Sequence, residues 1–106
     1  MYIQKFIIVP NIKIEKPVFE STVKKLEPKG LNNIWVSYDM KLYNDRYELS
    51  KEHRKNKTVI LLDKIKQIVI NDIDNILIVY FFSDAIQYKF EDINTCVSWK
   101  KLLNKK

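Results

Sequence analysis

The feature that most constrains the fold is an alternation of apolar and polar residues with period two along most of the chain. In one segment every second residue is apolar: Ile34, Val36, Tyr38, Met40 and Leu42. Successive side chains on a strand point to opposite faces, so residues 34–43 predict a long strand with one apolar face. Residues 86–90 repeat this pattern, whereas residues 76–82 are apolar throughout and predict a central strand.

Shorter runs of the same kind complete a set of seven predicted strands: residues 18–26, 34–43, 46–50, 58–62, 65–70, 76–82 and 86–90. The chain has one Gly, so its turns must use other residues that tolerate turn geometry. Asn and Asp tolerate it, and they occur where these strands should end. Seven short strands at this spacing predict an all-β sandwich or barrel.

The period changes to that of a helix near the end of the sequence. Apolar residues recur there at steps of three and four: Ile93, Cys96, Trp99 and Leu103. This spacing predicts one amphipathic helix at about residues 92–104, with Asp92 as its N-cap. Four lysines suit the negative end of the helix dipole, namely Lys100, Lys101, Lys105 and Lys106. We interpret these lysines as structural and Trp99 as a core residue.

Residues 1–17 precede the seven strands and form a separate predicted unit. Five of them are too apolar to remain in solvent: Tyr2, Phe6, Ile7, Ile8 and Val9. We interpret the segment as an N-terminal arm or extra strand on a domain of residues 18–106. We expect the arm to pack on the edge of that domain, to bind a protein partner, or to bind a second copy of the chain in a homodimer.

Signatures of catalysis and of metal binding are missing from the sequence. With one Gly there is no glycine-rich phosphate loop, and the single His, His53, lies in a charged loop where no neighbour would orient it. The single Cys, Cys96, lies on the apolar face of the predicted helix and reads as a core residue. We therefore predict a protein that is not an enzyme and has no cofactor. One Cys also suits a reducing compartment, so we expect it in the cytoplasm.

Charge is distributed unevenly along the sequence. The formal net charge is +6, made up of +5 in residues 1–57, −3 in residues 58–92 and +4 in residues 93–106. The excess in the first half favours an anionic partner there, although a solvated lysine-rich face would give the same count. Nucleic acid is not favoured. The best candidate for a base-stacking face is Trp35 with Lys41 and Tyr43, and the sequence has no RNP-like run of Gly and aromatic residues.

The order of these elements resembles the pleckstrin homology (PH) superfold. The resemblance is strongest at the end, where Tyr88-Lys89-Phe90 is similar to the last strand and Trp99 to the helix Trp that closes the open end of the barrel. It covers residues 18–106 and implies a seven-stranded bent barrel or sandwich, capped by the C-terminal helix.

The resemblance also implies a function for two basic loops. Lys24, Lys25 and Lys29 flank the first turn, and Lys51, Arg54, Lys55 and Lys57 belong to the loop between the third and fourth strands. In PH domains these loops lie side by side at the mouth of the barrel and bind phosphoinositide headgroups. The resemblance therefore implies a peripheral membrane module that binds anionic phospholipid, a phosphoinositide or phosphatidic acid, through Lys24, Lys25, Lys29, Arg54, Lys55 and Lys57.

The second predicted strand departs from the family pattern. Phosphoinositide-binding PH domains usually carry a basic-x-Arg step at its start, and this chain has Asn33-Ile34-Trp35-Val36 there. The alternative is therefore a protein-docking scaffold of the same fold that has lost lipid binding.

Overall fold

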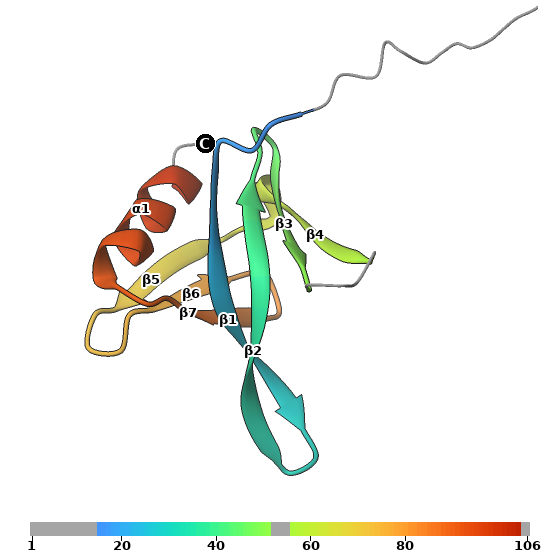
Figure 1. Cartoon of the computed structure of the whole chain (residues 1–106), viewed down its shortest axis with the longest axis vertical. Helices are drawn as coiled ribbons and strands as arrows, with labels where there is room; N and C mark the ends of the chain where they lie inside the picture. The colour runs from blue at the N-terminus through green and yellow to red at the C-terminus, as the bar shows by residue number, and fades with distance from the viewer. Residues whose placement is uncertain (1–14, 52–55, 105–106) are drawn as a thin grey trace, which may run out of the picture.

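The computed structural model describes residues 15–51 and 56–104, and these form one seven-stranded antiparallel sheet with one helix (Figure 1). The strands are β1 (Phe19–Lys29), β2 (Asn32–Leu42), β3 (Arg46–Ser50), β4 (Lys57–Leu61), β5 (Gln67–Asn71), β6 (Ile76–Tyr80) and β7 (Ala85–Lys89). The helix is α1 (Ile93–Leu103). The predicted class, all-β with one C-terminal helix, is confirmed.

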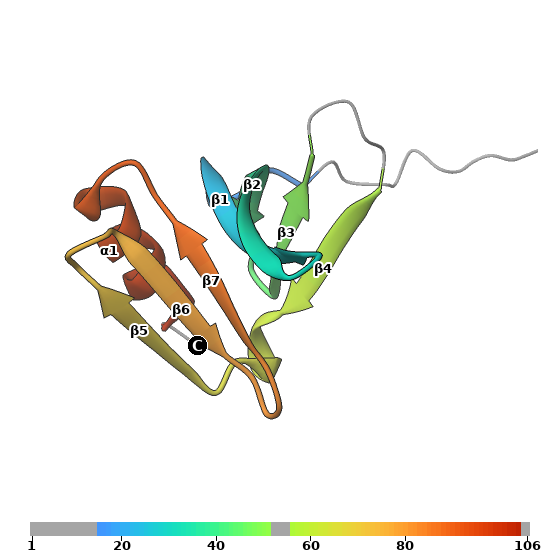
Figure 2. The same cartoon turned by 90° about the horizontal axis from the view of Figure 1, so that it is seen from below.

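The sheet is strongly bent and does not close on itself. Its strand order is β4-β3-β2-β1-β7-β6-β5, so β4 and β5 form its two edges. Figure 2 shows the β1–β4 half and the β5–β7 half as two layers that face each other at an angle. The halves are joined by only two residue pairs between β1 and β7, Lys24 with Lys89 and Lys25 with Tyr88. Side chains between the layers must therefore hold them together.

The core fills the angle between the two layers, and α1 covers its open side (Figure 1). Trp99 is fully buried there, with its ring against those of Phe19, Tyr47 and Phe90. The Nε1–H of Trp99 donates to Ser21 Oγ at 2.8 Å, which satisfies the one polar atom of the indole. The predicted core position of Trp99 is confirmed.

The helix begins and packs as its sequence predicts. Asp92 is the N-cap, and its Oδ1 accepts a hydrogen bond of 2.7 Å from the backbone N–H of Thr95. Cys96, Trp99 and Leu103 are its buried residues, so Cys96 is a core thiol as expected.

Strands β1 and β2 are longer than predicted, because the sequence placed turn residues where the hairpin continues. All eleven residues of each strand pair, from Phe19 with Leu42 to Lys29 with Asn32. Beyond Lys25 the hairpin leaves the body of the domain and projects from it (Figure 1). Ile34, which the alternating pattern placed on the apolar face of its strand, is therefore 38% exposed.

The connection between β4 and β5 also differs from the prediction. Residues 62–64 form a short 3₁₀ turn, so β4 ends at Leu61 and β5 begins at Gln67 rather than at 65. Leu62 is buried in the core, and its backbone N–H donates to the carbonyl of Asp45 at 3.0 Å. This hydrogen bond holds the chain where it passes from one layer to the other. It joins residues far apart in the sequence, so local periodicity could not predict it.

Candidate functional site

A cluster of charged side chains lies on the inner face of the projecting hairpin. It consists of Lys25 and Glu27 from β1, Tyr38 from β2 and Lys51, which follows β3; we call it the Tyr38 cluster. Lys25 Nζ lies 5.6 Å and Lys51 Nζ 5.4 Å from the centroid of the Tyr38 ring. Both distances are within the range of cation–π attraction. Two lysines far apart in the sequence, one on β1 and one after β3, thus meet over one aromatic ring.

Glu27 is the counterion of this cluster. Its Oε2 accepts hydrogen bonds from Tyr38 Oη and, at 3.2 Å, from Lys25 Nζ. Partial burial raises the pKa of Glu27, but these two hydrogen bonds and the charges of Lys25 and Lys51 lower it by more, so its net pKa lies below the usual value. Glu27 is therefore ionised at neutral pH, and the two lysines leave the cluster with a formal charge of about +1.

Adjacent residues of a strand point to opposite faces, and this separates the predicted site residues Lys24 and Lys25. Lys25 belongs to the Tyr38 cluster, whereas Lys24 lies on the outer face, opposite Ser37 of β2 and Lys89 of β7. Lys29 is exposed at the end of β1, beside a tip where Gly30 has φ +62° and Leu31 is fully exposed. These lysines were predicted to act together because they are close in the sequence. Closeness in the sequence does not determine on which face of the sheet a side chain lies.

The other predicted loop contributes Lys57, whose Nζ lies 3.0 Å from Glu48 Oε1 on the outer face of β3. The same carboxylate accepts a 2.8 Å hydrogen bond from Arg46 Nε. Arg46 also stacks over the ring of Tyr43. Tyr43, one of the aromatic residues considered for nucleic-acid binding, therefore already contacts a side chain of this domain. Arg54, Lys55 and His53 lie outside the described residues.

The end of β3, where the second basic loop begins, lies beside the β1–β2 hairpin. Ser50 pairs with Asp39 of β2, and Lys24 pairs with Ser37, so the loop after β3 leaves the sheet beside the middle of the β1–β2 hairpin. The structure therefore brings Lys25 close to Lys51 and leaves Lys24, Lys29 and Lys57 apart from them. Lys51 was not among the predicted lipid-binding residues, although the two-residue period from Leu49 would have placed it on the inner face.

A cluster of metal ligands and a membrane-spanning helix are both absent from the described residues. Within residues 15–51 and 56–104, no three His, Cys, Asp or Glu side chains gather as ligands for a metal ion. In that same part of the chain no helix could cross a membrane, since α1 has only eleven residues. The ammonium groups and hydroxyls of the hairpin can bind anions by charge-assisted hydrogen bonds.

Comparison with solved structures identifies the architecture. The N-terminal PH domain of human ARAP2 superimposes with a TM-score of 0.70 at 17% identity, over 80% of this chain and 74% of that one. The PH domain of human TBC1 domain family member 2 gives 0.67 at 16% identity, over 90% and 83%. Inner Membrane Complex Sub-compartment Protein 3 from Toxoplasma gondii gives 0.65 at 18% identity, over 80% and 71%.

Comparisons at the level of sequence do not extend this result. No protein-family model matches the chain, and no curated protein does. The seven-stranded unclosed sheet and the single C-terminal helix agree with the structural matches. The chain therefore has the PH-like fold.

Proposed function

We propose that this PH-like domain is a non-enzymatic module for peripheral membrane targeting that binds the anionic headgroup of a phospholipid at the Tyr38 cluster. The observation that carries the proposal is the approach of Lys25 and Lys51, from two separate hairpins, to the ring of Tyr38. Phosphatidic acid and singly phosphorylated phosphoinositides are the headgroups that best suit so small a cluster. We propose the cytoplasmic face of a membrane as its location.

The charge of the Tyr38 cluster and its surroundings determines how strongly we expect the domain to bind an anionic membrane. A basic residue near an anionic leaflet contributes about 1 kcal/mol to membrane binding. Lys25, Lys29 and Lys51 would together contribute at most about 3 kcal/mol, and Arg54, Lys55 and Lys57 of the adjoining loop would add to this. Ionic screening reduces these values, so a single domain would bind weakly and reversibly.

Glu27 gives the proposal a test that separates binding from folding. A headgroup phosphate must compete with this carboxylate for Lys25, so Glu27→Gln should strengthen vesicle binding about fivefold, which corresponds to about 1 kcal/mol. Lys25→Gln combined with Lys51→Gln should weaken it by at least that factor. Lys101→Gln, which neutralises an exposed lysine of α1, serves as the matched control.

Sedimentation with vesicles of phosphatidylcholine, alone or mixed with phosphatidic acid or phosphatidylinositol phosphate, measures these effects at about 0.15 M salt. Binding that is equal for neutral and anionic vesicles would reject the proposal. So would a Glu27→Gln variant that folds normally and binds more weakly than the parent chain.

A second candidate, a protein-docking scaffold, is favoured by the free edge of the sheet at β4. Val59 and Leu61 on that strand are 46% and 44% exposed, and an extended peptide could pair with its backbone. Residues 1–14 of the predicted N-terminal arm, the other element of this hypothesis, lie outside the described residues. Substituting Val59 and Leu61 with Thr should leave vesicle binding unchanged, and it should abolish partner binding only if the edge is the docking surface.

A further inference from the structure

The strand β4 presents a free edge that carries apolar side chains. Within residues 15–51 and 56–104 its only paired neighbour is β3, whereas α1 packs against the other edge strand, β5 (Figure 1). Val59 and Leu61 of β4 are 46% and 44% exposed. Proteins usually protect such an edge with charges, proline or a covering segment. Because β4 has one charged residue, Lys57, and no proline, we expect a segment to cover it.

The register of β4 shows which backbone groups face this edge. Opposite residues of an antiparallel pair alternate between hydrogen-bonded and non-hydrogen-bonded positions. The backbone N–H of Leu62 donates to the carbonyl of Asp45 at 3.0 Å, one step beyond the pair of Leu61 with Arg46. Leu61 and Val59 therefore occupy non-hydrogen-bonded positions, and their N–H and C=O groups point away from β3 toward the free edge.

The described chain begins beside this edge. Glu15 Oε1 accepts a hydrogen bond of 2.7 Å from Arg46 Nη2. The same guanidinium donates from Nη1 to Asp45 at 2.7 Å and from Nε to Glu48 at 2.8 Å. Three charge-assisted hydrogen bonds hold the guanidinium in place. Arg46 is the cross-strand partner of Leu61, so Glu15 is anchored next to the end of β4.

The sequence before this anchor suits the edge. Residues 1–14 lie outside the described residues, and six of the eight residues 2–9 are apolar. Residues 6–9 read Phe-Ile-Ile-Val, so a strand formed by them is apolar on both faces. β4 has the same character, because Ile60 packs against the core while Val59 is exposed on the opposite face. Apolar cross-strand neighbours would therefore meet on both faces of the sheet.

The connection between the anchor and this apolar segment is long enough to reach the edge. Pro10 has no N–H for a strand ladder, so the segment ends at Val9. The five residues 10–14 span roughly 17 Å when extended. A strand added to β4 lies two strand spacings, or about 10 Å, from β3. Glu15 contacts β3 through Arg46, so the segment can pair with β4 of its own chain.

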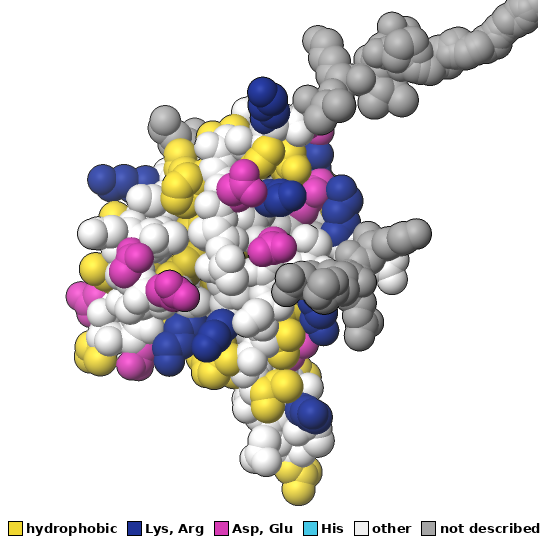
Figure 3. Space-filling view, in the orientation of Figure 1, with side chains coloured by type: hydrophobic (Ala, Val, Ile, Leu, Met, Phe, Trp, Pro, Cys, Tyr) yellow, Lys and Arg dark blue, Asp and Glu magenta, His cyan; other side chains and the backbone are white. Residues whose placement is uncertain are grey.

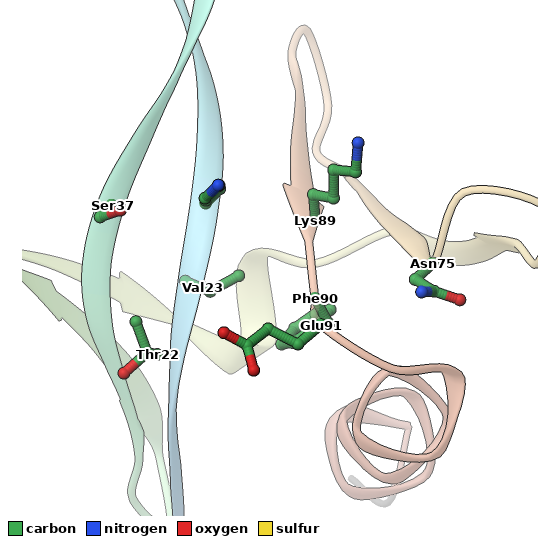
Figure 4. A pocket seen from close by; sticks show the side chains of 8 residues that line it. Thr22, Val23, Ser37, Asn75, Lys89, Phe90 and Glu91 are labelled. Atoms are coloured by element: carbon green, nitrogen blue, oxygen red, sulfur yellow. The ribbon is translucent and has the colours of Figure 1, made fainter.

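Two other surfaces do not suit an apolar segment. Figure 3 shows acidic and basic side chains next to one another over β1, β2 and β3, where Glu20 lies opposite Lys41. The cleft of about 350 Å³ between β1 and the end of β7 is lined by charged residues, among them Lys89 and Glu91 (Figure 4). An apolar segment on either surface would remove these charges from water without pairing them.

We propose that residues 2–9 form an eighth strand on the β4 edge of the same chain, positioned by the contact of Glu15 with Arg46. The segment pairs with the outward N–H and C=O groups of Val59 and Leu61 and covers their side chains. Because the connection is short, the local concentration of the chain's own segment exceeds that of a second copy. The proposal does not depend on lipid binding at the Tyr38 cluster. It implies that a docking partner must displace this segment from the edge.

Amide hydrogen exchange of the full chain, followed by NMR, tests the pairing at Val59 and Leu61. Successive N–H groups of a strand point to opposite sides, so only one of Ile7 and Ile8 directs its N–H toward β4. Proline at that position removes the pairing donor, and proline at the other position leaves it. One of the variants Ile7→Pro and Ile8→Pro should therefore speed exchange at both β4 amides about tenfold, while the other serves as its matched control.

The core amide of Met40 should exchange equally slowly in both variants, which shows that the domain is folded. Fast exchange at Val59 and Leu61 in the parent chain would overturn the proposal. So would two proline variants that have the same effect on these amides, because a paired strand must distinguish adjacent positions.

The same measurement tests the anchor and the identity of the strand. Glu15→Gln weakens the contact with Arg46 and should speed exchange at Val59 and Leu61 about threefold, whereas Glu20→Gln, the matched control, should not. Equal exchange in Glu15→Gln and the parent chain would contradict the anchored arrangement. Protection that disappears on dilution, together with a dimer in analytical ultracentrifugation, would show that a second copy covers the edge and would overturn the proposal.

Discussion

Trp99 is the residue through which α1 holds the two layers of the sheet together. Its ring contacts Phe19 of β1 and Tyr47 of β3 as well as Phe90 after β7, so it spans both halves. The indole also uses its only donor, to Ser21 Oγ. Loss of the side chain would remove packing from both layers at once and leave a cavity that rigid strands cannot fill.

We therefore expect Trp99→Ala to lower the free energy of unfolding by about 3–5 kcal/mol in urea titrations followed by circular dichroism. Ser21→Ala, which only leaves the indole N–H without an acceptor, should cost about 1–3 kcal/mol. If Trp99→Ala were no more destabilising than Ser21→Ala, then α1 would not be closing the core.

Glu48 is the one charged residue among the buried side chains of the described chain. Burial raises its pKa, but hydrogen bonds from Arg46 and Lys57 and their charges lower it by more, so its pKa lies below the usual value. A carboxylate with a lowered pKa stabilises the fold above the unfolded pKa of about 4.3, and this contribution is lost as the pH falls through the folded pKa.

Glu48→Gln should therefore lower the urea midpoint at pH 7 and reduce the further loss of stability on acidification below about pH 4.3. Urea titrations across this range measure both effects. Glu20→Gln removes an exposed carboxylate and is the matched control. Equal acid sensitivity of the Glu48 variant and the parent chain would show that Arg46 and Lys57 do not stabilise the ionised form.

At the scale of elements, the β1–β2 hairpin positions the Tyr38 cluster. Its inner face carries Lys25 toward this cluster, whereas Lys24 lies on its outer face. The projecting part, beyond the last pairing with β7, is held by pairs within the hairpin and by its turn. That turn needs Gly30, whose φ of +62° lies in the left-handed region.

Gly30→Ala should cost about 1 kcal/mol from backbone strain alone, because a Cβ at this position would contact nothing within 4 Å. The strain acts on a hairpin end that can open by itself, so we expect faster amide hydrogen exchange at residues 27–34 and little change at Val23 or Met40. Faster exchange that extends to these two core positions would show that the tip is coupled to global unfolding.

The order of the elements and the residues on their core faces could be predicted from local periodicity. The contacts between residues of different strands could not. The pattern identified seven strands and a capped helix because burial imposes periods of two and 3.6 on single segments. It missed that Lys51 approaches Tyr38 and that Lys24 pairs with Lys89, sixty-five positions away in the sequence, because these relations depend on how strands pair and bend. It also grouped Lys24 with Lys25, although the two side chains lie on opposite faces of β1.

At the scale of the whole molecule, side chains join the two layers more than the backbone does. β1 and β7 share two residue pairs, whereas Tyr47 of β3 and Tyr88 of β7 meet inside the core with their hydroxyl oxygens 2.8 Å apart. Both rings are fully buried and pack edge to face. Burial raises the pKa of Tyr47 and of Tyr88, and the proximity of Tyr47 raises that of Tyr88 further.

This hydroxyl pair predicts a loss of stability at alkaline pH. Tyrosine in the unfolded chain ionises near pH 10, while the folded pair stays protonated well above it, so stability is complete below about pH 10 and is lost as the pH rises further. Tyr47→Phe leaves the Tyr88 hydroxyl without its partner and should cost about 1–3 kcal/mol at pH 7. Replacing both tyrosines by Phe should restore most of that stability and flatten the alkaline loss. Urea titrations from about pH 8 to about pH 11 test this. The layers would not be coupled through this hydrogen bond if the double variant were as unstable as Tyr47→Phe alone. The same would follow if the double variant lost as much stability at alkaline pH as the parent chain.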